Sequence, residues 1–117
     1  MKIAFSGCRD KTVFRSRITD VLQLLGPDFQ SDDWILAGDA KGVDECVRRY
    51  AELRQFNLRI FEANWDKYQR SAGPIRNKLM IDEADTLVAF WDGKSRGTKN
   101  CIRCATDKGI PVLIMPI

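Results

Sequence analysis

The chain has 117 residues, of which 44% are hydrophobic and 30% charged, and it carries a net charge of +3. This length predicts one domain over residues 1–117 that buries roughly 65% of the surface exposed by the unfolded chain. The sequence has four cysteines and no histidine, which excludes a Ser-His-Asp triad, a Cys-His dyad and a histidine-ligated metal. The weak positive charge alone does not indicate a nucleic-acid-binding protein.

The first half of the chain is predicted to alternate strand, helix, strand and helix. Short apolar runs predict buried strands at Lys2–Ser6 and Asp33–Ala37. Apolar residues at helical spacing predict helices over Thr12–Leu25 and Val43–Arg54. In the first of these helices, Phe14 is expected to lie on the apolar face.

The second half repeats this alternation around a long polar connection. We expect further strands and helices at Leu58–Phe61, Ala72–Ala84, Thr86–Trp91, Gly97–Lys108 and Val112–Met115, with Glu62–Ser71 as a turn. Strands that are apolar throughout are typical of parallel sheets covered on both faces. Since crossover connections are right-handed, five strands and four helices predict an α/β fold with a parallel sheet of order 3-2-1-4-5.

Three of the predicted strands end directly in turns rich in glycine and charged residues. In a parallel sheet, the loops after the carboxyl ends of the strands form the ligand crevice. We expect Gly7, Gly42 and Gly97 to lie at this edge and to let the backbone approach a ligand. The helices that follow begin with N–H groups that attract anions. The sequence therefore predicts a crevice between residues 7–10 and 92–98.

Basic side chains are concentrated in and beside these turns, which suggests phosphate binding. The predicted ligand- and phosphate-binding residues are Gly7, Arg9, Gly38, Lys41, Gly42, Asp44, Arg76, Asn77, Arg96, Gly97, Thr98 and Lys99. Arg76 and Arg96 are placed near helix starts, where cations are unfavourable, so we expect both to hold one phosphate. The alternative is that these bases serve solubility and decorate helix ends.

Three further groups of side chains are candidates for chemistry. The candidate catalytic residues are Asp10, Asp44 and Arg76, with a helix-capping role as the alternative for Asp44. The candidate base-stacking residues are Trp65, Tyr68 and Trp91, with loop packing as the alternative. The cysteines are expected to be reduced and packed as small apolar residues, with zinc held by all four as the alternative. We expect no metal and no cofactor.

Several segments together resemble a known family. Ser6-Gly7-Cys8-Arg9-Asp10, Gly38-Asp39-Ala40-Lys41-Gly42-Val43-Asp44 and Ala72-Gly73-Pro74-Ile75-Arg76-Asn77-Lys78-Leu79-Met80 resemble the YspA-like branch of the SLOG superfamily. The stretches 65–68 and 89–98 are similar to the same branch. This superfamily groups the DNA processing protein A and Lonely Guy domains. The resemblance implies a Rossmann-like three-layer sandwich that binds a nucleotide or nucleotide-derived ligand, in a branch often carried by phages and mobile elements.

The Lonely Guy enzymes cleave the N-glycosidic bond of nucleoside 5′-monophosphates with an arginine and a glutamate. The segment 76–80 is similar to their first motif, and Arg76 matches the arginine. The segment 97–101 is similar to their second motif, but Cys101 stands where the glutamate would be. Glycosidic cleavage depends on a carboxylate. The resemblance therefore implies slow or absent cleavage unless another acid substitutes, for which the candidates are Asp10, Asp39, Asp44 and Asp92.

The sequence thus predicts a domain that binds or senses a nucleotide-like small molecule at the carboxyl edge of the sheet. One alternative is a hydrolase of a nucleotide or its N-glycosidic bond, similar to a phosphoribohydrolase. The other is a single-stranded nucleic-acid-binding module, because Gly42-Val43-Asp44 is similar to an element of DNA processing protein A. We expect a cytoplasmic protein without a signal peptide or membrane partner. Both a monomer and a homo-oligomer fit this expectation.

Overall fold

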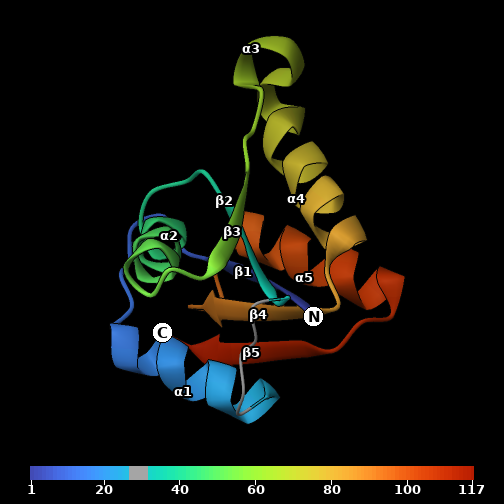
Figure 1. The fold of residues 1–117 in the computed structure, drawn as a ribbon. Coiled ribbons are helices and arrows are strands. Elements are labelled where there is room, and N and C mark those ends of the chain that lie inside the picture. The colour runs from blue at the N-terminus through green and yellow to red at the C-terminus, as the bar shows by residue number, and fades with distance from the viewer. Residues whose placement is uncertain (27–31) are drawn as a thin grey trace.

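The computed structural model describes residues 1–26 and 32–117. Five strands alternate with helices along the chain (Figure 1). The strands are β1 (Lys2–Gly7), β2 (Trp34–Gly38), β3 (Asn57–Phe61), β4 (Thr86–Trp91) and β5 (Val112–Pro116). The helices are α1 (Arg15–Leu25), α2 (Val43–Leu53), α3 (Trp65–Tyr68), α4 (Ala72–Glu83) and α5 (Arg96–Lys108), with a 3-10 turn η1 (Gln69–Ser71). None of the helices within the two described ranges is both long and apolar enough to cross a membrane.

All five strands are parallel and lie in the order β3-β2-β1-β4-β5. The central strand β1 pairs with β2 on one side and β4 on the other, so that Ala4 lies opposite both Leu36 and Leu87. The chain first builds the sheet outward from β1 to β3 and then returns to the other side of β1. This confirms the predicted order and places the topological switch point between β1 and β4.

Helices cover both faces of the sheet, which confirms a three-layer α/β sandwich (Figure 1). On one face, Ile18 of α1 and Val47 of α2 pack against Phe5 of β1. On the other face, Met80 of α4 and Cys101 of α5 are buried against residues of the central strands, among them Leu36. Successive β1 side chains point to opposite faces, which explains why a run that is apolar throughout forms this strand.

Two local predictions differ from the structure. The first helix begins at Arg15 rather than Thr12, because the preceding segment is extended and buries Val13 against the core. Phe14 consequently points to solvent with 82% of its surface exposed, and its predicted place on the apolar face is wrong. The expected turn over 62–71 contains α3 and η1, and Asn64 caps α3 by accepting a hydrogen bond from the Lys67 backbone N–H.

The three glycines predicted at the carboxyl edge differ in their roles: Gly7 ends β1, Gly42 is the N-cap of α2, and Gly97 lies in the first turn of α5. A Cβ on Gly7 would lie 2.4 Å from the Val43 side chain, so this glycine lets α2 pack against β1. Gly42 has a φ of 74° and would bring a Cβ 2.4 Å from the Cys8 carbonyl oxygen. A Cβ on Gly97 would meet nothing within 4 Å. Of the three, only Gly97 leaves open space toward a ligand.

Candidate functional site

A cavity of about 440 Å³ lies at the carboxyl edge of the sheet, at the switch point. Its walls come from the ends of β1 and β2, the starts of α2 and α5, and the stretch from α3 to α4. Eleven of the predicted site residues line it: Gly7, Arg9, Asp10, Gly38, Asp44, Trp65, Arg76, Asn77, Arg96, Gly97 and Thr98. The carboxyl edge of the sheet therefore brings together residues that are separated along the chain.

Five other predicted residues do not line this cavity. Lys41 lies on a neighbouring hollow of about 390 Å³, which it shares with Arg9 and Trp65. Gly42 is used in loop packing, and Lys99 is exposed on α5. The remaining two are aromatic, namely Tyr68 and Trp91. The Tyr68 ring lies 5.0 Å from the Lys67 ammonium, and the Trp91 indole donates a hydrogen bond to the Ser95 carbonyl.

Arg76, Asp44 and Gly38 lie next to one another in the cavity, and we call this part of the lining the floor. Arg76 is 7% exposed. It lies one turn inside α4, which begins at Ala72 as predicted, and therefore not at the helix start near which it was expected. Its Nη1 donates to the Asp39 carboxylate at 2.7 Å and to the Phe61 carbonyl at 3.4 Å, and its Nε donates to the Asn77 amide oxygen at 3.0 Å. Within the described residues, Nη2 has no hydrogen-bond partner. This arginine is thus fixed on one side and open to the cavity on the other.

Asp44 lies beside Arg76 on the same floor and is 5% exposed. A Cβ on Gly38 would come within 2.6 Å of both Arg76 Nη1 and Asp44 Oδ2, so the absence of a side chain at Gly38 makes room for this pair. Burial raises the pKa of Asp44 to about 6, although the charges of Arg76 and Arg48 and the Ala40 backbone N–H oppose the rise. A buried carboxyl group with this pKa can exchange a proton near neutrality.

The first turn of α5 forms another wall of the cavity, to which Arg96, Gly97 and Thr98 contribute. Ser95 is the N-cap of this helix, and its preceding loop is fixed by Asp92, whose Oδ1 accepts hydrogen bonds from the Lys94 and Ser95 backbone N–H groups at 2.8 and 2.9 Å. These bonds also hold the pKa of Asp92 below its usual value. Arg96 is exposed and forms no ion pair with any described residue. This wall is suited to an anion.

Asn77 connects the floor to the α5 wall. Its amide oxygen accepts from Arg76 Nε, while its amide nitrogen donates to the Gly97 carbonyl at 3.2 Å and to the Asn100 side-chain oxygen at 3.1 Å. The residue is 5% exposed. Both polar atoms of the Asn77 side chain are therefore engaged in holding α4 and α5 together, so Asn77 fixes the lining of the cavity.

The mouth of the cavity is bordered by an aromatic ring. The Arg9 guanidinium lies 5.4 Å from the centroid of Trp65, which is 45% exposed. Trp65 lies close to α4, since a Cβ on Gly73 would be in ordinary van der Waals contact with the indole ring at 3.5 Å. An exposed indole paired with a cation offers a flat surface to a ligand ring. This supports the stacking prediction for Trp65 but gives no such support for Tyr68 or Trp91.

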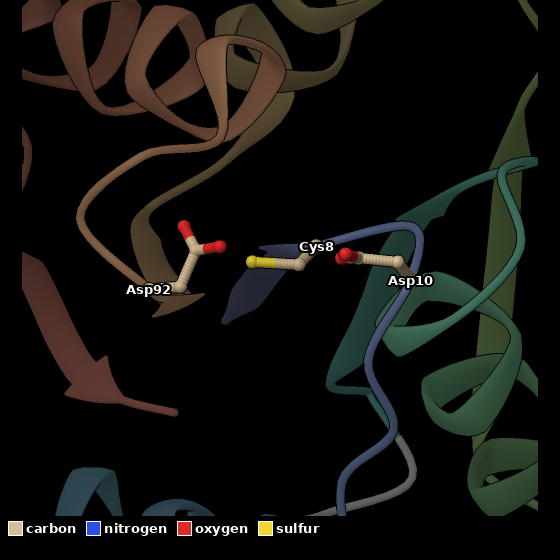
Figure 2. A group of neighbouring side chains, drawn as sticks. All are labelled: Cys8, Asp10 and Asp92. Carbon is tan, nitrogen blue, oxygen red and sulfur yellow. The ribbon is translucent and has the colours of Figure 1, made fainter.

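One group of side chains could supply three ligands to a metal ion. Cys8, Asp10 and Asp92 each place one ligand atom within 4.8 Å of the others, and Figure 2 shows the Cys8 sulfur directed toward Asp92. Burial raises the pKa of the Cys8 thiol, so a metal would have to displace its proton. The four cysteines do not form such a group with one another within the described ranges, and all four are free thiols. The alternative of zinc held by all four is therefore wrong.

Cys101, at the position implied for a glutamate, is fully buried between α5 and the sheet. Burial raises the pKa of its thiol to about 12, so it carries no charge near neutrality. Sequence reasoning missed Ser6, Arg70, Ser95 and Asn100, which also line the cavity. The position of Ser6 directly before Gly7 was a usable signal, because strand ends define this edge. Arg70 and Asn100 carried none, since both lie within helical turns.

Comparison with known proteins identifies a relative encoded by a phage. The chain is 38% identical over 85 residues to "Gene 61 protein" of Mycobacterium phage D29, and the match covers 68% of each chain. No protein-family model matches the chain. No solved structure matches it either.

Proposed function

The chain belongs to the family of the Gene 61 protein of Mycobacterium phage D29, and we propose that its cavity binds or senses a nucleotide or a nucleotide-derived ligand. The observation that carries this proposal is the α5 wall, where the start of a helix and Arg96, which has no ion-pair partner among the described residues, line a cavity at the switch point. An anionic group suits that wall, and the Trp65 ring suits a base. The motif segments within this cavity also support placing the family in the YspA-like branch of the SLOG superfamily.

The first test is calorimetric titration of the protein with nucleoside mono- and diphosphates, ADP-ribose, NAD and cyclic nucleotides, with single-stranded oligonucleotides as a separate arm. Arg96→Ala should weaken binding of the best ligand about tenfold, because it removes one charge-assisted contact to phosphate. Lys99→Ala is the matched control, since Lys99 is a cation at the same helix start but does not line the cavity. It should change the Kd less than twofold. Equal effects of both variants would contradict the assignment, as would tighter binding of oligonucleotides than of any nucleotide.

A second candidate function is hydrolysis of the N-glycosidic bond, with Asp44 as the general acid. Only the position of this carboxyl group in the cavity, and its pKa of about 6, favour this candidate. The neutral Cys101 thiol cannot stabilise an oxocarbenium-like transition state as a carboxylate does. Chromatography of AMP incubated with the protein decides between the two functions. Base release that is abolished in Asp44→Asn would favour hydrolysis over binding alone.

A further inference from the structure

The floor of the cavity presents a donor and an acceptor whose hydrogen bonds are incomplete. The Asp44 carboxylate is 5% exposed, and among the described residues no side chain donates to it; the Ala40 backbone N–H is the group that faces it. Arg76 is not close enough to form an ion pair with Asp44, and its Nη2 is also open to the cavity. Among the described residues no fully buried side-chain polar atom lacks a hydrogen-bond partner, so the open atoms of this pair are reached by solvent that a ligand would displace. A ligand that occupies this floor must therefore both donate and accept.

The charges on the floor disfavour phosphate at this position. Arg76 is already neutralised by its ion pair with Asp39, and Asp44 adds a second carboxylate next to it. A phosphate placed here would meet a carboxylate without a free countercharge, and as a dianion it would have no proton to donate to Asp44. The anion-binding features lie instead on the α5 wall. The floor is therefore better suited to an uncharged group that carries hydroxyl or N–H donors.

We infer that the floor binds the sugar hydroxyls of a ribonucleotide and that Asp44 selects ribonucleotides over 2′-deoxyribonucleotides. This inference rests on the proposed function. Each hydroxyl of a vicinal diol can donate to the Asp44 carboxylate while it accepts from Arg76 Nη2, which satisfies both groups at once. With phosphate on the α5 wall and the base against Trp65 at the mouth, the sugar lies between them, over the floor. Carboxylates bind ribose hydroxyls in other nucleotide sites of parallel α/β sheets.

The experiment compares matched pairs that differ by one hydroxyl. AMP against dAMP, GMP against dGMP, and ribose 5-phosphate against 2-deoxyribose 5-phosphate are titrated calorimetrically into the full chain. We expect the ribose member of each pair to bind about tenfold or more tightly, because a site built around a hydroxyl rejects the analogue that lacks it. The base-free pair tests the sugar alone.

Variants identify the residue responsible. Asp44→Asn should remove the preference by weakening the ribose ligands to the level of the deoxy ligands, whose affinity should not change. Glu45→Gln is the matched control, since Glu45 neighbours Asp44 in the same helical turn but pairs with Arg49 outside the cavity. It should retain the full preference. Far-ultraviolet circular dichroism of each variant verifies folding.

The outcomes separate this inference from the proposed function. Equal binding of ribose and deoxyribose members, with sensitivity to Arg96→Ala, would overturn the role of Asp44 and leave nucleotide binding intact. A preference that survives in Asp44→Asn would also overturn it. The protein could instead discriminate among bases and not among sugars, and lose this discrimination in Asp44→Asn. That result would place the edge of the base on the floor and contradict the inference. Failure of every phosphate ligand to bind would overturn the proposed function as well.

Discussion

The floor and the α5 wall of the cavity each contribute an arginine, but the two are in opposite situations. Arg76 on the floor is buried, faces two carboxylates and is held by three protein groups. Arg96 on the α5 wall is exposed and has no ion-pair partner in the described part of the chain. From sequence alone both were expected to hold one phosphate. The difference teaches that the free charge, and not the presence of an arginine, decides where an anion can bind.

Replacing each arginine with methionine should give the largest contrast. Arg76→Met removes the ion pair to Asp39 and leaves Asp44 buried without its nearby cation. Breaking a fully buried ion pair typically costs about 3–5 kcal/mol, and because the Asp39 side chain is 35% exposed we expect a smaller loss, of about 1–3 kcal/mol. Arg96→Met should change the free energy of unfolding by less than about 0.5 kcal/mol. Urea unfolding measures both values, and similar stabilities for the two variants would refute the distinction between the walls.

The Asp44→Asn variant should show a pH-dependent gain in stability. The folded pKa of Asp44 is about 6, above its ordinary value of 3.8. Between these values the native state binds the proton more strongly, so the stability that the neutral form provides is lost as pH rises through 6. The asparagine side chain cannot ionise, so the variant should be more stable by up to about 3 kcal/mol at pH 8 and equal to the parent near pH 3. Urea unfolding at both pH values tests this, and a variant that is less stable at pH 8 would show that the ionised carboxylate stabilises the fold.

Two glycine-to-alanine substitutions should change stability least. They test how much space there is for a methyl group on the floor and on the α5 wall. On the floor, the Cβ of Gly38→Ala would lie 2.6 Å from Arg76 Nη1 and Asp44 Oδ2, which are buried and cannot move freely. Overpacking of this kind costs roughly 1–3 kcal/mol. In α5, Gly97→Ala meets no neighbour within 4 Å and should stabilise the helix by up to about 1 kcal/mol. Thermal unfolding should therefore move in opposite directions, and a stabilised Gly38→Ala would show that the floor has spare room.

The sequence was sufficient to predict the sheet because each strand is an apolar run that ends at a turn. The strand Thr86–Trp91 was predicted without error, and the others differ from the structure by one residue at one or both ends. The start of α1 could not be predicted from the sequence. The apolar residues Val13 and Phe14 are compatible both with a first helical turn and with an extended segment before the helix. Their real positions depend on a tertiary contact of Val13 with the core.

The site was predicted at the level of loops but not at the level of charges. Residues such as Arg9 and Gly97 were found because parallel strands bring their carboxyl ends to one edge. The ion pair between Arg76 and Asp39 joins residues 37 positions apart and depends on side-chain geometry that no local pattern encodes. The same is true of the burial that raises the pKa of Asp44. The difference between the floor, where Arg76 is paired, and the α5 wall, where Arg96 is not, could therefore be recognised only from the three-dimensional structure.

The bridge made by Asn77 has a consequence for how parts of a ligand add up. Since its amide ties Arg76 to the Gly97 carbonyl, the distance between the floor and the start of α5 is set before any ligand arrives. A molecule whose length matches that span gains the second contact at little further entropic cost, whereas two separate fragments each lose their own freedom of motion. Intact ribose 5-phosphate should accordingly bind far more tightly than the separate affinities of ribose and inorganic phosphate would suggest.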